Sequence, residues 1–335
     1  MPLVSVIIPV YNGEKTIQTT VESALSQTLT DLEVIVVNSG STDRTQQILQ
    51  GMSDARLTIV DYPKAIVSVN RNRGVTQAQS DYLCFLDADD LWTKDKLACQ
   101  YQALQENSQA AVVYSWTNCI DQSDRVLRKC RYVNYAGNVL PQLLLDDFIG
   151  NGSNAMIRRQ AFAEVQGFDE SLTNAEDTDL WLRLAAKYEF TVVPKVQVLY
   201  RISAQSKSSN VKRMEVMNLR VIEKAFSDAP SSLQYLKRYS SGNLYKYLSY
   251  RALETQPGQQ KTLTTLRFIL QSAIASPDLL KKPIIAKALL KLAIMTFVPS
   301  KQAELLLQQF PKIANTFTFM GYEIVDLSQL RGTDK

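Results

Sequence analysis

The sequence predicts an α/β protein: a mostly parallel sheet with helices on both faces, followed by an all-helical C-terminal region. Within the first 115 residues, short β-branched runs alternate with segments of helical apolar spacing, which is typical of such sheets. Residues 116–205 are less regular, and from about residue 211 the chain continues as helices separated by prolines. We therefore expect a first domain over 1–205, with halves 1–115 and 116–205, and a helical region over 206–335.

The individual elements follow from local periodicity. β-branched or apolar runs predict strands, and apolar residues three or four apart, such as Ile17, Val21 and Leu25, predict helices. Strands are expected over 3–10, 33–37, 57–60, 82–86, 111–115 and 190–193. Helices are expected over 14–27, 43–49, 69–79, 94–107, 159–165 and 177–188.

Composition excludes several function classes. The formal charge of +4 is too small to indicate a nucleic-acid partner. The chain has no histidine, which excludes Ser-His-Asp, Cys-His and H-E-x-x-H sites, and its four cysteines form no C-x-x-C pair. The N-terminal apolar run lacks the features of a signal peptide, and no apolar stretch reaches the ~20 residues of a membrane span. We expect a cytoplasmic protein whose chemistry rests mainly on carboxylates.

A first carboxylate cluster follows the apolar run 82–86. Asp87 and Asp89 lie two residues apart where this expected strand ends, and their hard oxygens suit Mg²⁺ or Mn²⁺. A solvated acidic turn is the alternative, but the position between a buried strand and Leu91-Trp92 favours a metal. Asp90, which breaks the two-residue spacing, is expected to brace the turn.

A second cluster opens the helix expected from about residue 177. Glu176, Asp177 and Asp179 lie there next to Trp181, and helix capping would account for only one or two acidic residues. One carboxylate would then serve as a general base toward an alcohol. Arg71, one helix before the first cluster, would supply a countercharge, unless it is simply exposed at a helix start.

Six motifs in order resemble the family 2 glycosyltransferases, which are inverting enzymes with a GT-A-type fold. The resemblance covers residues 3 to about 203. The matching stretches are VSVIIPVYNGE (4–14), VVNSGSTD (36–43), NRNRG (70–74), YLCFLDADDLW (82–92), GFDESL (167–172) and AEDTDLWLRLA (175–185).

The resemblance assigns roles to individual positions. It implies that Asp89, with Asp87, meets the metal and the ribose, and that Asp177 is the catalytic base with Glu176 beside it. Trp181 would line the acceptor side. The remaining donor contacts implied are Pro9, Tyr11, Glu14, Asn38, Ser39 and Arg71.

Two positions depart from the commoner family pattern. Asn38-Ser39 replaces a pair of aspartates on the uridine side, and no histidine follows Tyr200-Arg201. These departures keep open a second hypothesis, a catalytically silent nucleotide-sugar-binding or scaffolding protein. A dinucleotide-dependent dehydrogenase is disfavoured, because no G-x-G-x-x-G follows the first strand.

The resemblance implies transfer of a sugar from a nucleotide-diphosphate sugar, with a UDP-sugar favoured, to a hydroxyl of a glycan or lipid-linked sugar. Cell-surface polysaccharide or another glycoconjugate would be the product. Between Asp278 and Glu304 the tail carries five lysines, including Lys287 and Lys291, and no acidic residue. This pattern predicts peripheral contact with the inner face of the cell membrane. Packing of the same helix on the protein is the alternative.

Overall fold

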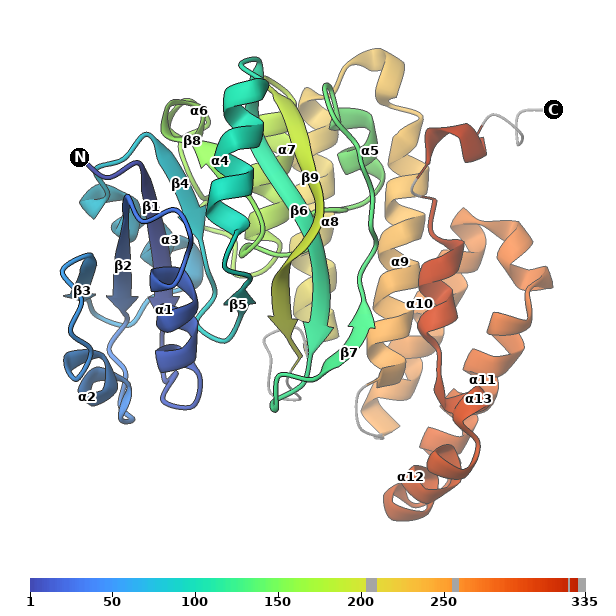
Figure 1. Cartoon of the computed structure of the whole chain (residues 1–335). Helices are drawn as coiled ribbons and strands as arrows, with labels where there is room; N and C mark the ends of the chain where they lie inside the picture. The colour runs from blue at the N-terminus through green and yellow to red at the C-terminus, as the bar shows by residue number, and fades with distance from the viewer. Residues whose placement is uncertain (203–209, 255–258, 325, 331–335) are drawn as a thin grey trace. The chain divides into compact units, whose positions relative to one another are not determined.

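A computed structural model describes residues 1–202, 210–254, 259–324 and 326–330 (Figure 1). The chain divides into two compact units, which we describe separately. Unit 1 comprises residues 1–143 and 147–204, and unit 2 comprises residues 144–146 and 205–335. Among the described residues, no helix combines the length and apolar character needed to cross a bilayer.

Unit 1 is built around one sheet with the strand order β3-β2-β1-β4-β8-β6-β9-β5, and β7 pairs with β6. Strands β3, β2, β1 and β4 are mutually parallel, so their carboxyl ends lie at one edge of the sheet. The other half is mixed, because β8 is antiparallel to both β4 and β6, whereas β9 is parallel to β6. The strands are β1 Val4–Val10, β2 Leu32–Asn38, β3 Leu57–Asp61, β4 Tyr82–Phe85, β5 Leu91–Trp92, β6 Ala110–Ile120, β7 Val126–Lys129, β8 Met156–Arg158 and β9 Glu189–Arg201.

Helices cover both faces of this sheet, as expected from its apolar strands. Successive side chains of β1 point to opposite faces, so Val6 and Ile8 pack in a core with α1 and α4, whereas Ile7 faces α3. Gly74 permits the close approach of α3, because a Cβ there would lie 2.3 Å from Cγ2 of Ile7. The helices are α1 Ile17–Leu25, α2 Thr45–Gln50, α3 Val67–Gln77, α4 Lys96–Glu106, α5 Leu140–Leu145 (which crosses the unit boundary), α6 Arg159–Glu164 and α7 Glu176–Ala185.

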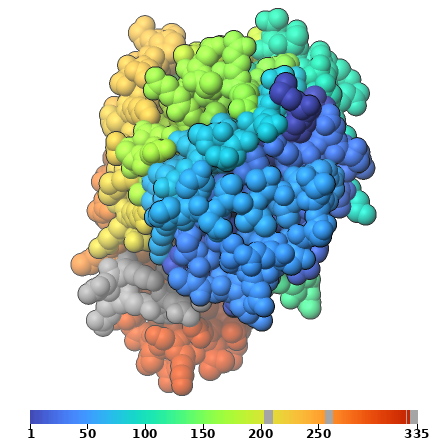
Figure 2. All heavy atoms as spheres, turned by 90° about the vertical axis from the view of Figure 1, so that its left-hand side faces the viewer, coloured from blue at the N-terminus to red at the C-terminus, as the bar shows by residue number. Residues whose placement is uncertain are grey.

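Strand β3 is the edge strand on this side of unit 1, and its residues are partly or fully exposed there; residues of the N-terminal part of the chain, blue in the space-filling view, form this surface (Figure 2). The order of strands and helices along the chain confirms the expected α/β fold with a helical C-terminal region. Several strands differ from the prediction. The strands expected over 111–115 and 190–193 extend to Ile120 and Arg201, and the short strands β5, β7 and β8 were not predicted.

Unit 2 is helical where it is described. Its apolar side chains form two clusters, one around Leu248 and Phe268 and the other around Leu253, Ala288 and Phe319. Lys291, one of the five tail lysines, is buried here against Glu254 at 3.0 Å and does not contribute to the basic surface. The α-helices are α8 Val211–Asp228, α9 Leu236–Glu254, α10 Gln259–Ala275, α11 Pro283–Phe297, α12 Ser300–Gln309 and α13 Pro311–Ala314, and four short 3₁₀ segments cover Ser231–Leu233, Pro277–Lys281, Phe317–Tyr322 and Leu327–Leu330.

Candidate active site

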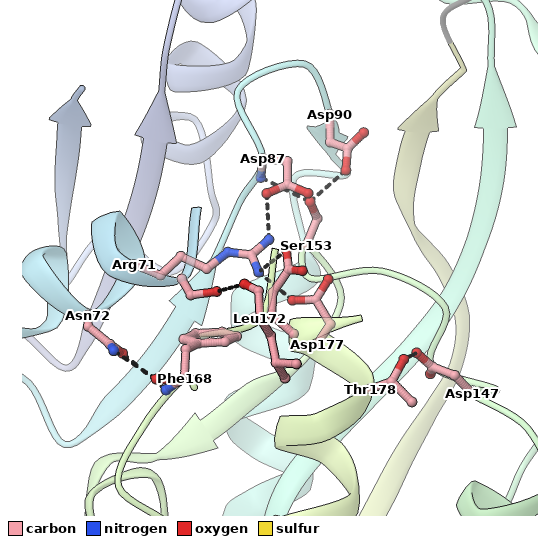
Figure 3. A network of polar contacts seen from close by, with 12 residues as sticks. Arg71, Asn72, Asp87, Asp90, Asp147, Ser153, Phe168, Leu172, Asp177 and Thr178 are labelled. Carbon is pink, nitrogen blue, oxygen red and sulfur yellow. Dashed lines mark hydrogen bonds and ion pairs between the residues drawn. The ribbon is translucent and has the colours of Figure 1, made fainter. Parts of the chain in front are cut away.

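Arg71 links the two predicted carboxylate clusters. Its side chain on α3 is only 1% exposed, and its Nη2 donates to Oδ1 of Asp87 at 2.7 Å. Its Nη1 donates to Oδ1 of Asp177 and lies 3.6 Å from Oε1 of Glu176 (Figure 3). Burial disfavours the charged form of Arg71, but Asp177, Asp87 and Glu176 together raise its pKa, so the guanidinium stays protonated. The alternative prediction, an exposed helix-start arginine, is wrong.

The ring of Phe168 supports this guanidinium, with its centroid 5.0 Å from Cζ of Arg71. On another side the backbone of Gly152 approaches so closely that a Cβ there would lie 2.3 Å from Nη2 of Arg71 and 2.9 Å from Oδ1 of Asp177. Among the described residues Nε of Arg71 is buried and has no hydrogen-bond partner. The arginine is therefore held by packing as well as by charge.

The turn after β4 is braced through Asp90. This side chain is fully buried and accepts from Oγ of Ser153 at 2.6 Å and from the backbone N of Arg201 at 2.9 Å. Ser153 Oγ in turn accepts from the backbone N of Asp87 at 3.0 Å (Figure 3). Burial, and then the charges of Asp89 and Asp87, raise the pKa of Asp90. The prediction that Asp90 braces the turn is confirmed, and Asp87 and Asp89 remain half-exposed at the sheet edge.

The second cluster lies in the first turn of α7. The preceding residue, Ala175, has φ +60°, a left-handed conformation that costs a non-glycine residue roughly 1–2 kcal/mol and turns the chain into the helix. Burial and the charges of Glu176, Asp87 and Asp147 raise the pKa of Asp177 to about 8, against the lowering effect of Arg71. The pKa of Asp177 is therefore far above that of an ordinary aspartate.

The other residues of α7 have structural contacts. Asp179 is 2% exposed and accepts from Nε of Arg183 at 2.8 Å, one turn later on the helix. Trp181, expected to line the acceptor side, is fully buried in the core and presents no surface in this structure. Thr178 Oγ1 donates to Oδ2 of Asp147 at 2.7 Å, which ties the start of α7 to the segment after α5.

The expected donor contacts lie at the carboxyl ends of β1 and β2. Tyr11 is 43% exposed, with Nζ of Lys64 3.9 Å from its ring centroid, and this ammonium lowers the pKa of Tyr11. Glu14 accepts from Nε of Arg44 at 3.2 Å. Pro9, by contrast, is buried within β1.

Asn38 and Ser39 are both buried. Nδ2 of Asn38 donates to Oδ1 of Asp61 at 2.7 Å and to Oε1 of Gln46 at 2.8 Å, and Oγ of Ser39 accepts from the backbone N of Ala65 at 2.9 Å. A carboxylate is therefore present beside position 38, but it comes from the end of β3. Sequence reasoning missed Asp61, because nothing in the local pattern connects these two strand ends.

Fold and site together define an α/β enzyme with acidic clusters at the carboxyl edge of a parallel half-sheet. Residues 5–252 match the family model described as "Glycosyltransferase like family 2". The chain belongs to this family and is a glycosyltransferase, and the resemblance seen in its motifs is confirmed.

One relative is the Escherichia coli protein named UDP-Glc:alpha-D-GlcNAc-diphosphoundecaprenol beta-1,3-glucosyltransferase WfaP. It is 28% identical, and the match covers 75% of this chain and 98% of that protein. Several other curated relatives are longer, and the chain spans only 20% to 61% of their length.

Two solved structures share the GT-A-type fold. Residues 1–349 of S. aureus TarS in complex with UDP match with a TM-score of 0.59 at 20% identity, covering 92% of each chain. The mannosyltransferase PcManGT from Pyrobaculum calidifontis, in complex with GDP-Man and Mn²⁺, matches with a TM-score of 0.56 at 19% identity, covering 96% of this chain and 88% of that one. At these identities the likeness concerns the fold alone, and it confirms the predicted fold class.

Proposed function

We propose that the protein transfers a sugar from a nucleotide-diphosphate sugar to an acceptor hydroxyl, with inversion at the anomeric carbon. The observation that carries this proposal is the bridge that Arg71 makes between Asp87, on the expected donor side, and Asp177, the expected base. A buried cation shared by two half-buried carboxylates fixes their separation. Donor and acceptor would therefore meet at a defined distance.

Asp177 is the proposed general base. Its pKa is about 8. A carboxylate with so high a pKa is a stronger base than an ordinary aspartate, and it therefore accepts a proton from an alcohol more readily. The acceptor oxygen attacks the anomeric carbon as its proton moves to Asp177, and the bond to the nucleoside diphosphate breaks on the opposite face. Arg71 places positive charge beside the departing diphosphate and holds Asp177 in position.

The residues present fit a divalent cation. Asp87 and Asp89 offer half-exposed carboxylate oxygens, and the described part of the chain contains no group of three or more His, Cys, Asp or Glu side chains suited to a metal. Two carboxylates can hold Mg²⁺ or Mn²⁺, because these ions commonly take their remaining ligands from substrate phosphate and water. Asp89, with Asp87, would hold the ion, which supplies Lewis-acid stabilisation of the diphosphate.

A UDP-sugar is the proposed donor, supported by the name of the WfaP relative and by the UDP bound in TarS. The proposed acceptor is a hydroxyl of a lipid-linked sugar or glycan in cell-surface polysaccharide synthesis, as the name of WfaP indicates for that protein. Asp61, held by Asn38, would supply the carboxylate that the Asn38-Ser39 sequence lacks on the nucleoside side.

A thermal-shift panel of UDP-, GDP-, dTDP- and CDP-sugars, with and without Mn²⁺, tests the donor assignment. We expect stabilisation by UDP-sugars that increases with Mn²⁺ and is lost in Asp89→Asn. Asp81→Asn, which changes an exposed carboxylate before the N-terminal end of β4, the end away from Asp87 and Asp89, is the matched control. A panel without any shift would overturn the donor proposal, and a GDP-sugar preference would overturn its uridine part.

A further inference from the structure

Helix α11 is apolar on two sides but is buried on only one of them. Ile284, Ile285, Ala288, Lys291 and Leu292 are buried within unit 2. The exposed side carries Ala286, Leu290, Ala293 and Phe297, whose spacing of four, three and four residues makes one continuous stripe. Phe297 is 85% exposed and Leu290 is 47% exposed. A helix that is apolar all round normally has a partner on every side.

Helix α10, which packs against α11 in unit 2, repeats this pattern. Leu263, Leu270 and Ile274 are 77%, 53% and 68% exposed, and their spacing of seven and four residues places them on one face. Of the sixteen large apolar residues that are exposed in the described part of the chain, ten lie between residues 263 and 317. Such a concentration marks an interaction surface, because single exposed apolar residues are normally scattered.

The same region holds the net positive charge of the protein. Residues 259–324 contain eight lysines and arginines but three acidic residues, whereas the remaining chain contains 29 basic and 30 acidic residues. Two of the eight, Arg267 and Lys291, pair with Glu215 and Glu254, so the surface charge comes from the others. Lys282 is exposed and precedes Ala286 by one helical turn, and Lys301 is exposed four residues beyond Phe297. Lys281 pairs with Asp278 at 3.0 Å, so these two residues add no net charge.

We propose that the exposed stripes of α10 and α11 dock on an anionic lipid bilayer, with the apolar side chains in the headgroup–acyl boundary and the lysines among the headgroups. Charge decides between possible occupants, because a second copy of the chain would bring like charges together, whereas anionic headgroups complement them. The stripe from Ala286 to Phe297 is about 16 Å long, enough for a helix lying in the interface. This inference does not depend on the proposed reaction.

Vesicle co-sedimentation of the full chain tests it, with phosphatidylcholine vesicles compared with vesicles that also contain phosphatidylglycerol. We expect pelleting with the anionic vesicles that weakens with salt, and a loss of at least about tenfold in partitioning for the double variant Leu290→Gln/Phe297→Gln. The matched control is Val126→Gln/Leu127→Gln, on β7, whose side chains are 57% and 55% exposed. Thermal unfolding checks that both variants are folded.

Wild-type protein that stays in the supernatant with anionic vesicles would overturn the proposal. So would equal binding by the apolar variant and its control, or a dimer that dissociates in the apolar variant while vesicle binding is unchanged. The assay contains no donor, so failure of the catalytic proposal leaves its result unaffected.

Discussion

Gly152→Ala should disrupt the site through one methyl group. The new Cβ would lie 2.3 Å from Nη2 of Arg71 and 2.9 Å from Oδ1 of Asp177, whereas ordinary contacts begin at 3.4 Å. Relieving this overlap moves the guanidinium by about 1 Å, and a displacement of that size costs about 10²-fold in rate. We therefore expect kcat to fall about 100-fold in nucleoside-diphosphate release assays, with a smaller change in KM.

Gly51→Ala is the control, because Gly51 has a negative φ and a Cβ there would meet only two backbone oxygens, at 3.4 and 3.6 Å. A double-mutant cycle with Arg71→Lys separates positioning from general loss of stability. If Gly152 acts through the guanidinium, the cost of Gly152→Ala should shrink by about tenfold or more when Arg71 is already lysine. Activity of Gly152→Ala within twofold of wild type, or full additivity in the cycle, would refute this reasoning.

Three further predictions follow from charges in unit 1. Because Asp177 must be ionised to accept a proton and its pKa is about 8, kcat/KM should fall as pH drops below about 8, and a flat profile from about pH 6 to 10 would contradict this role. Arg71→Met leaves Asp87 and Asp177 without their countercharge. The free energy of unfolding, measured by urea denaturation, should therefore fall by about 3–5 kcal/mol. A loss under about 1 kcal/mol would refute the stabilising role of the buried bridge. Asn38→Asp replaces the amide that donates to Asp61 at 2.7 Å with a second carboxylate. Thermal unfolding at pH 7 should show a loss of about 1–3 kcal/mol in the free energy of unfolding. Unchanged stability would show that the hydrogen bond between Asn38 and Asp61 does not stabilise the fold.

The parallel half-sheet was predictable because β1, β2 and β4 are almost entirely buried on both faces and therefore form continuous apolar runs, as Val4–Val10 does. The short strands were not, because β5 has two residues and β8 has three, too few to show a period. The second half of β9 was missed because it contains Pro194 and Lys195, which interrupt the apolar pattern.

The acidic motifs of the site were predictable, but their connection was not. Nothing in the sequence shows that Arg71 reaches Asp177, 106 positions later, because that contact forms only when the fold brings α3 and the first turn of α7 together. The segment containing Gly152 and Ser153 is rich in glycine and asparagine, a signal that the backbone approaches another group, but the group cannot be known before folding. Trp181 shows the reverse, since the motif suggested a surface residue and the helix periodicity buries it.

The most direct test of the central claim is the release of nucleoside diphosphate from the donor that the binding panel selects, compared between wild type and Asp177→Asn. We predict turnover by the wild type and a loss of about 10²–10⁴-fold in Asp177→Asn, with donor-induced stabilisation retained because the donor contacts are intact. Asp81→Asn, which changes an exposed carboxylate just before the N-terminal end of β4, should keep turnover within about tenfold of wild type. Turnover by Asp177→Asn equal to that of the wild type would contradict the assignment of the base.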